Sequence, residues 1–320
     1  MAVELFITNR GNTIYYPPVE DDIQIVWERT GTAGKLTFKL IDDGTFEIQE
    51  GDVVSLLVDG TKLFRGFVFT VKRTQDADVS VTAYDQLRYF KNKETYTYTK
   101  TATELIKTIA SDFNLQVGSL ADTGYVIPSR VEDKKTLFDI VKTALDLTLE
   151  NTKELFIFYD DFGSLTLKNL SDMKVNILID ADTAQSFDYQ SSIDSDTYNQ
   201  VKLVYDNKDT GARDAYVVKD SSHINDWGLL QYLDEIKEGE NGQTKAEGLL
   251  QLYNQKTKTL TISNVFGDTR VRAGSLVIVQ LSLGDISLNN YMLVEKCTHT
   301  FKENEHYMTL KLRGGVINSA

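Results

Sequence analysis

The chain has 320 residues, of which 41% are hydrophobic and 25% are charged. This composition is typical of a globular protein, and a chain of this length usually divides into more than one core. Aspartate and glutamate outnumber lysine and arginine by 47 to 34, so the formal net charge is −13. Such an acidic balance disfavours stable nucleic-acid binding, which depends on clustered basic residues, but it suits a protein past which nucleic acid slides.

The sequence predicts no membrane insertion. Its longest apolar stretches, residues 155–159 and 276–279, are far shorter than the roughly 18 to 20 residues that span a bilayer. The N-terminus carries Glu4 where a secretory signal would carry basic residues, so we expect synthesis and folding in the cytoplasm. A single cysteine, Cys297, excludes a disulfide within the chain and a zinc site made of cysteines alone.

Residues 6–83 show the two-residue period of half-buried strands. Segments 36–40 and 79–83 alternate apolar with polar side chains, and helical spacing is absent. Turn signals separate the alternating runs at residues 42–44, 59–60 and 75–78. Closely spaced strands joined by hairpins predict a small barrel or sandwich.

The pattern changes near residue 100, where helices are predicted. Thr101 and Glu104 have the spacing of a capping box, ahead of an apolar helical stripe. A second helix is predicted to begin near Asp133, and a hairpin is predicted to turn at residues 160–163. Residues 96–180 therefore form a predicted unit of mixed helices and strands.

Strand character returns after this unit. Residues 201–205 alternate, a helical segment is predicted near residues 243–256, and strands resume over residues 260–312. The second β region is thus predicted to be interrupted by an insertion that contains a helix.

An internal repeat is suggested by three correspondences between the two β regions. They pair residues 51–56 with 274–279, 69–74 with 293–298, and 35–40 with 199–205. The first pair is a glycine that enters an apolar strand in both regions. If each chain contains two copies of one β domain, a closed cyclic ring would contain twice as many β domains as chains.

A metal site is one interpretation of the last strands. Cys297, His299 and His306 fall on one face if the final hairpin turns near residue 303. The same face carries apolar residues, Phe301 among them, so buried and hydrogen-bonded core residues are the better interpretation.

Two acidic pairs could serve as a glycosidase acid and base or as calcium ligands: Asp160 with Asp161, and Asp180 with Asp182. Both pairs lie at predicted turns, where aspartate is favoured by local backbone hydrogen bonds. The chain has no Gly-x-Ser-x-Gly, His-Glu-x-x-His, Walker or Gly-x-Gly-x-x-Gly motif. We therefore predict no catalytic, cofactor-binding or metal-binding residues, and no enzyme activity.

Several segments together resemble one family. They are residues 50–56, 63–68, 81–90, 227–231, 272–277 and 291–301. Their order, over most of the chain, resembles that of the XkdQ-like tail proteins of phages and phage-derived tail particles. This family is related to the baseplate hub of contractile tails and to the late-control D protein. Trp227 stands where the family's Tyr-Gly pair has a tyrosine, which is a local departure.

The resemblance implies a homotrimer with two tube-like β domains per chain, arranged in a pseudo-six-fold ring that joins the tail tube to the central spike. The implied partners are further copies of the chain, the tail tube protein, the central spike protein and the baseplate wedge proteins, with the tape-measure protein or DNA passing through the lumen. The implied location is the baseplate of a virion or tail particle, after assembly in the bacterial host cytoplasm. The net charge of −13 favours an acidic or neutral lumen in which these molecules do not stick.

The predicted fold class is α+β and mainly β, with two tube-type β-barrel domains, a peripheral α/β domain and a helical insertion. The predicted domains are residues 1–95 for the first tube-type domain, 96–180 for the α/β domain, 181–206 with 259–316 for the discontinuous second tube-type domain, and 207–258 for the insertion. Edge strands are predicted to contact neighbouring subunits, because ring closure hides exposed strand edges. The predicted contact residues are Gly51, Val53, Ser55, Leu57, Gly274, Leu276, Ile278 and Gln280.

Two other functions stay open on the residues alone. One is a tail-associated cell-wall (peptidoglycan) hydrolase, and the other is a carbohydrate-binding β module that would use some of the 16 tyrosines and 15 phenylalanines. Aromatic side chains in alternating strands usually pack across neighbouring strands, which favours a structural role for them.

Overall fold

The computed structural model describes residues 1–20, 22–41, 48–74, 78–180, 183, 185–194, 197–207, 211–236, 241–283 and 286–314. They form two compact units, one of residues 1–188 with 261–312 and one made mainly of residues 189–260. The predicted α+β, mainly β class is confirmed. In the described part of the chain the strand pairings do not close into a barrel. None of the helices described is both long and apolar enough to cross a membrane.

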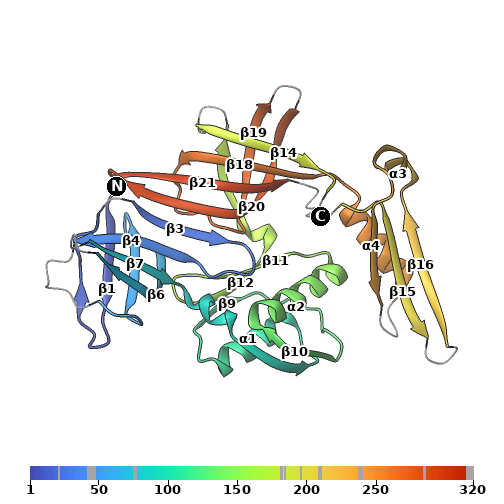
Figure 1. Cartoon of the computed structure of the whole chain (residues 1–320), viewed down its shortest axis with the longest axis horizontal. Helices are drawn as coiled ribbons and strands as arrows, with labels where there is room; N and C mark the ends of the chain where they lie inside the picture. Colours follow the sequence, from blue (N-terminus) through green and yellow to red (C-terminus); the bar gives the residue numbers. More distant parts are fainter. Residues whose placement is uncertain are drawn as a thin grey trace. The chain divides into compact units, whose positions relative to one another are not determined.

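The first β repeat is built from the N-terminal strands (Figure 1). These are β1 (Val3–Thr8), β2 (Ile14–Tyr15), β3 (Ile23–Glu28), β4 (Lys35–Ile41), β5 (Val53–Val58), β6 (Thr61–Arg73) and β7 (Asp78–Tyr84). They lie in the order β3-β4-β7-β6-β5-β1-β2. The turn predicted at Asp59 and Gly60 joins β5 to β6, with φ of 47° and 75° as a tight hairpin requires. The predicted turn at residues 42–44 lies outside the described residues, as does most of that at 75–78.

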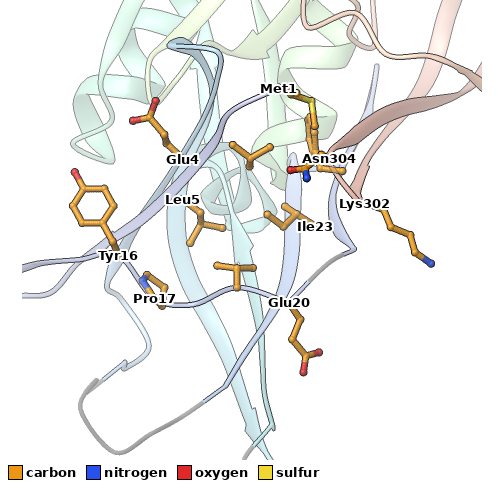
Figure 2. A pocket seen from close by; sticks show the side chains of 12 residues that line it. Met1, Glu4, Leu5, Tyr16, Pro17, Glu20, Ile23, Lys302 and Asn304 are labelled. Atoms are coloured by element: carbon orange, nitrogen blue, oxygen red, sulfur yellow. The ribbon is translucent and has the colours of Figure 1, made fainter.

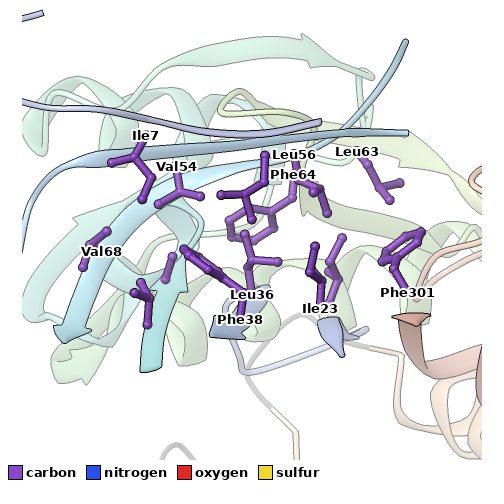
Figure 3. Packing of buried hydrophobic residues seen from close by; sticks show 14 of the residues in the cluster. Ile7, Ile23, Leu36, Phe38, Val54, Leu56, Leu63, Phe64, Val68 and Phe301 are labelled. Atoms are coloured by element: carbon purple, nitrogen blue, oxygen red, sulfur yellow. The ribbon is translucent and has the colours of Figure 1, made fainter. Parts of the chain in front are cut away.

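The core of this repeat lies between two parts of the curved sheet (Figure 3). Side chains of β1, β5 and β6 face those of β3 and β4, because strand alternation places every second residue on the inner face. Leu36, Leu56 and Phe64 are almost completely buried. Phe301, from a strand near the C-terminus, enters the same cluster and so ties distant parts of the chain to it.

The second β repeat has the same strand order as the first. Its strands are β13 (Lys174–Ile179), β14 (Ser186–Ser192), β18 (Thr257–Phe266), β19 (Leu276–Leu283), β20 (Ile286–Lys302) and β21 (Glu305–Gly314). They lie in the order β14-β18-β21-β20-β19-β13, which matches β3-β4-β7-β6-β5-β1 strand for strand. One difference is direction, because β13 runs parallel to β19 whereas β1 runs antiparallel to β5.

Backbone hydrogen bonds confirm the predicted repeat at its glycines. The Gly51 amide donates to the Val68 carbonyl at 2.8 Å, and the Gly274 amide donates to the Val294 carbonyl at 2.8 Å. Both glycines have a positive φ, of 92° and 95°, which side chains other than hydrogen disfavour. Val68 and Val294 are therefore equivalent residues of the two repeats.

Two of the predicted correspondences need correction. Residues 35–40 do not match 199–205, because β4 corresponds to β18 and residues 200–207 belong to another sheet. Residues 69–74 do match this part of β20, but with an alignment displaced by two residues, so that Phe69 corresponds to Glu295. A shift of two residues keeps every side chain on the same face, so the hydrophobic pattern does not reveal it.

The α/β domain follows the first repeat. Its elements are η1 (Gln86–Lys91), β8 (Lys93–Tyr98), α1 (Ala102–Asp112), β9 (Val117–Leu120), β10 (Arg130–Thr136), α2 (Leu137–Thr152), β11 (Phe156–Asp160), β12 (Leu165–Asn169) and η2 (Leu170–Met173). The strands form the sheets β10-β8 and β11-β12-β9. The hairpin predicted at residues 160–163 is confirmed between β11 and β12.

The two helices of this domain start at polar caps. The predicted capping box is confirmed, since the Glu104 amide donates to the Thr101 hydroxyl at 3.2 Å and the Thr101 amide donates to Glu104 Oε2 at 2.9 Å. The second helix does not begin near Asp133, which lies in β10. It begins at Leu137, because the Thr136 hydroxyl accepts the Asp139 amide and so caps it.

The second unit is a small two-layer fold. Its elements are β15 (Gln200–Asn207), β16 (Ala212–Lys219), α3 (Ser221–Trp227), β17 (Gln231–Glu235) and α4 (Gly242–Tyr253). The sheet has the order β16-β15-β17, and α4 packs on β15 and β16. The helical segment predicted near residues 243–256 is therefore confirmed as α4. Val201, Leu203 and Leu249 form the centre of a separate core.

Replacing Gly274 by alanine should destabilise the protein more than the same change at Gly60. Both positions have a positive φ, which costs an alanine about 1 to 2 kcal/mol. A Cβ at Gly274 would also lie 2.3 Å from Cγ2 of the buried Ile157, whereas a Cβ at Gly60 meets nothing within 4 Å. We expect Gly274→Ala to cost about 2 to 4 kcal/mol in urea unfolding. Equal losses for the two variants would contradict the tight packing of Gly274 on the α/β domain.

Candidate functional site: the joint between the two repeats

The predicted ring-contact residues lie on strands that have a neighbour on each side. β5 is paired with β1 and β6, and β19 is paired with β13 and β20. The expectation that these are edge strands is therefore wrong, because their backbone groups already belong to ladders within the chain. Gly51 and Gln280 are exposed, whereas Ser55 and Leu276 are buried.

The two repeats are joined by one strand pair. β3 of the first repeat runs antiparallel to residues 296–301 of β20, with Trp27 opposite Cys297 and Ile25 opposite His299. Beyond the ladder, the Arg29 amide donates to the Glu295 carbonyl at 2.9 Å. The sheet therefore continues from one repeat into the other without interruption.

Ion pairs support the solvent-facing side of this joint. Lys296 Nζ lies 2.9 Å from Glu28 Oε1, and Arg29 Nε lies 2.8 Å from Glu295 Oε2. The Arg29 and Glu295 side chains are 18% and 22% exposed, so this pair is partly shielded from solvent. The Lys296 and Glu28 side chains are 45% and 40% exposed and form an ordinary surface pair. Both pairs favour this register, since a slip along β20 would separate them.

The opposite side of the joint is buried and carries the residues that could have held a metal. Cys297 and His299 are fully buried, and His299 Nδ1 lies 2.7 Å from His306 Nε2. His299 Nε2 lies 2.9 Å from the Val271 carbonyl, which only accepts, so this nitrogen carries the proton and Nδ1 accepts from His306. The interpretation as packed, hydrogen-bonded core residues is confirmed for Cys297 and His299, and His306 is partly buried beside them. Among the described residues no group of three His, Cys, Asp or Glu side chains could hold a metal ion.

Burial keeps both imidazoles neutral. It lowers the pKa of His299 to about 3, with the neighbouring His306 as a further cause, and it lowers the pKa of His306 to about 4. Burial also raises the pKa of the Cys297 thiol well above its ordinary value, so this cysteine stays protonated and unreactive.

Arg272 lies behind the joint and touches three parts of the chain. Its guanidinium lies 3.8 Å from the ring centroid of Tyr159 and 5.1 Å from that of Trp27. Arg272 Nη2 donates to the Asp160 carbonyl at 2.8 Å. The cation thus connects β3, the end of β11 and the turn that precedes β19.

Two buried carboxyl groups belong to this cluster. The Asp85 carboxylate accepts the amides of Gly34 at 2.9 Å and Leu87 at 3.0 Å, and so fixes the start of η1. Burial raises the pKa of Asp85, with the nearby Asp160 as a further cause, while Arg272 acts in the opposite direction. Burial also raises the pKa of Asp160, whose Oδ1 accepts the Gly163 amide at 2.7 Å. The turn interpretation of Asp160 is confirmed.

Sequence reasoning missed the role of Arg272. The residue lies in one of the segments that carry the family resemblance, yet nothing local separates it from Arg270 two positions earlier. Arg270 is exposed and pairs with Asp268 at 2.6 Å, whereas Arg272 is buried between aromatic rings. Only the tertiary contacts with Trp27 and Tyr159 reveal the difference.

A hollow of about 330 Å³ opens near the N-terminus (Figure 2). Figure 2 shows Leu5 and Ile23 towards its centre, with the charged ends of Glu20 and Lys302 directed outward. Apolar side chains within a charged rim suit contact with protein better than they suit chemistry.

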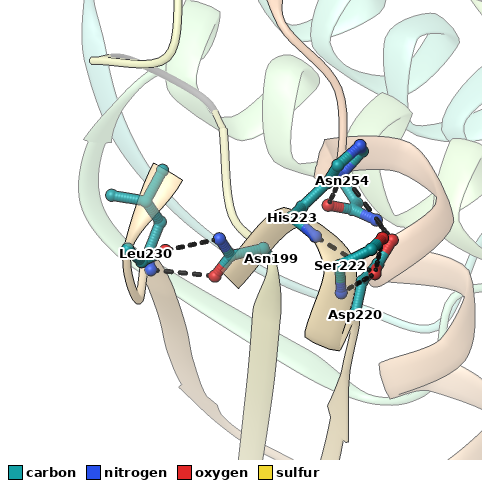
Figure 4. Close-up of polar contacts among 7 residues, drawn as sticks. Asn199, Asp220, Ser222, His223, Leu230 and Asn254 are labelled. Carbon is teal, nitrogen blue, oxygen red and sulfur yellow. Dashed lines mark hydrogen bonds and ion pairs between the residues drawn. The ribbon is translucent and has the colours of Figure 1, made fainter. Parts of the chain in front are cut away.

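A polar cluster in the second unit holds α3 to α4 (Figure 4). Asp220 Oδ1 accepts the Ser222 amide and hydroxyl, and Asp220 Oδ2 accepts from Asn254 at 2.7 Å. The Ser222 and Asn254 hydrogen bonds lower the pKa of Asp220. His223 Nδ1 lies 2.7 Å from Asn254 Oδ1, and the His223 ring stacks on Trp227. These hydrogen bonds connect the start of α3 to the end of α4.

The chain is similar to known proteins over most of its length. A family model described as YQBQ-like matches residues 23–313. The protein YqbQ of Bacillus subtilis (strain 168), described as uncharacterized, is 30% identical, with 96% of this chain and 95% of the relative covered. The phage-like element PBSX protein XkdQ of the same organism is 32% identical, with 84% and 83% covered.

Solved structures show the same fold at low identity. The 43 kDa tail protein of prophage MuSo2 from Shewanella oneidensis matches with a TM-score of 0.70 and 13% identity, covering 97% of this chain and 98% of its own. The E. coli c3393 protein, described as a type VI secretion component similar to T4 tail proteins gp27 and gp5, matches with a TM-score of 0.57 and 11% identity, covering 99% and 78%.

Removing the guanidinium of Arg272 should unfold the protein more easily than removing that of Arg270. Arg272→Met leaves Asp160 and Asp85 buried without their cation, and breaking such a group costs about 3 kcal/mol. Arg270→Met removes an exposed pair and should change little. Urea unfolding at pH 7 measures both, and similar midpoints would show that Arg272 does not hold the three parts together.

The buried histidines should make the protein less stable in acid. Well above pH 6.5, from about pH 8 upward, both are neutral in the folded and unfolded chain, so pH has no effect through them there. As pH falls towards 4, both histidines become protonated in the unfolded chain but stay largely neutral in the folded chain. The free energy of unfolding therefore decreases. His306→Gln should reduce the loss between pH 7 and 4.5 by about 2 kcal/mol in urea unfolding. His223→Gln, in the other unit, controls for loss of a histidine. An unchanged loss in His306→Gln would contradict the assignment.

Proposed function

Because the chain belongs to the YqbQ-like family, we propose that it is the structural hub of a phage tail or phage-tail-like particle. In this role three copies form a ring with pseudo-six-fold symmetry between the tail tube and the central spike. The likeness to prophage tail proteins supports a structural role in a tail. The c3393 protein, described as similar to T4 gp27 and gp5, supports a place near the spike.

The carrying observation is the duplication of one six-strand β unit, with its two copies joined through β3 and β20. A ring that must meet six-fold symmetry on one side and three-fold symmetry on the other needs two equivalent units per chain. The matching strand orders and the paired glycines, Gly51 and Gly274, supply such units. In the ring, each unit would complete a tube-type barrel with its neighbours.

The proposed partners follow from this position. One face of the ring would bind the tail tube protein and the other the central spike, with baseplate wedge proteins around the periphery. The tape-measure protein or DNA would pass through a lumen kept acidic or neutral by the net charge of −13. Of the predicted contact residues, Gly51 and Gln280 would act through exposed surface, since the backbone of β5 and β19 is already paired.

A role without catalysis is part of the proposal. Asp160, the best candidate acid, is 5% exposed and accepts a hydrogen bond from the Gly163 amide of its own turn. Its surroundings stabilise a junction between domains, as the stacked Arg272 does beside it.

The stoichiometry of the chain tests the proposal. Native mass spectrometry of the purified full chain at several concentrations, and quantitative mass spectrometry of tail particles that contain it, should give three copies per assembly. Negative-stain class averages of the trimer should show a ring with six similar β units around a channel. One, two or six copies per tail particle, or a compact trimer without a channel, would contradict the hub.

A further inference from the structure

In the described part of the chain, β20 has a strand neighbour that its equivalent β6 lacks. On the edge of β20 away from β21, residues 286–293 carry β19 and residues 296–301 carry β3. On the equivalent edge of β6, residues 61–67 carry β5. The next residues of β6 are paired with β7 on the other edge, but in the described part of the chain no strand lies where β3 lies on β20.

β14, the strand equivalent to β3, lacks a second strand neighbour in the described part of the chain. β3 lies between β4 and β20, and β14 takes the place of β3 in the second repeat. β14 is paired with β18 and ends the sheet, with no second strand beside it among the described residues. The edge of β6 is therefore equivalent to the edge of β20, and β14 is equivalent to β3. Within the chain, β3 and β20 are already paired with each other.

We propose that β14 of one copy pairs antiparallel with residues 70–72 of β6 in the next copy, as β3 pairs with β20 within each chain. This inference rests on the proposed ring and names the strands that close it. Two different edges meet, so the contact is heterologous and builds a ring from successive copies. Closure removes both open edges, which would otherwise template aggregation.

Side chains at the two edges have the chemistry of the internal joint. Val68 and Val294 are equivalent, so Val71 corresponds to the buried Cys297 and Thr70 to Lys296. Val71 is half-buried, and it would be covered by a strand placed as β3 is.

The donor strand supplies the complementary groups. Phe187 of β14 is 49% exposed, a large apolar side chain that a second strand edge would cover. Asp188 next to it and Lys72 of β6 are both exposed and of opposite charge. The internal joint likewise pairs acids of β3 with lysines of β20, as Glu28 does with Lys296.

Matched substitutions of exposed phenylalanines test the apolar contact. Phe187→Asp should raise the trimer dissociation constant at least tenfold, measured by sedimentation velocity of the full chain over a range of concentrations. Phe266→Asp introduces the same change at a side chain that is 69% exposed on β18, an inner strand, and should leave assembly unchanged. Thermal unfolding of each variant checks that the fold is kept.

Charge reversal tests the polar contact independently. Lys72→Glu and Asp188→Lys should each weaken assembly several-fold, because like charges would meet across the interface. The double variant should restore wild-type assembly, while Lys39→Glu on the inner strand β4 is the control.

The outcomes separate the two proposals. A trimeric wild type that loses assembly only in the β6 and β14 variants supports the strand pairing. A trimer unaffected by Phe187→Asp, Lys72→Glu and Asp188→Lys overturns the pairing and leaves the hub intact. A wild type that never assembles, alone or in tail particles, overturns the ring and the pairing together.

Discussion

The largely buried guanidinium of Arg272 contacts three parts of the first unit. Burying a cation costs several kcal/mol unless aromatic faces, carbonyls and carboxylates compensate for the lost water. Arg272 has all three kinds of partner, in Tyr159, the Asp160 carbonyl and the nearby Asp85. Tyr159 and Asp160 belong to β11 of the α/β domain, Asp85 follows the first repeat, and Arg272 itself precedes β19 of the second repeat. The compensation therefore exists only when these three parts are correctly packed. A looser arrangement would leave the buried cation without these partners, so the cost of burying it favours the observed packing.

The duplication also explains a difference between the repeats. β1 runs antiparallel to β5, whereas β13 follows directly from η2 and runs parallel to β19. β1 and β13 thus occupy equivalent positions in the sheet but run in opposite directions relative to the neighbouring strand. Position is decided by the strand edge that must be covered, whereas direction is decided by the connection that brings the strand there.

Local features of this fold could be predicted from the sequence, and non-local ones could not. The Thr101 cap, the Asp59 turn and the alternation of β4 depend on neighbours within a few residues, so the sequence pattern contains them. The choice of β18 over β15 as the counterpart of β4 depends on pairings between strands that are distant in the sequence, and both strands alternate. The two-residue displacement along β20 keeps every side chain on its face, so only hydrogen bonds such as that of Gly274 to Val294 could reveal it.

The internal joint constrains how copies of this chain can associate. β3 and β20 are different strands, so a contact built like theirs repeats head to tail and cannot give a two-fold dimer. Repetition of one rotation gives either a closed ring or an open filament, and the angle between the repeats inside the chain decides which. At the joint, Lys296 pairs with Glu28 on the solvent-facing side of the sheet, and Trp27 lies near Arg272 on the other side. In the proposed ring, the geometry of the internal joint would set the curvature of the assembly, because each contact between copies would repeat it.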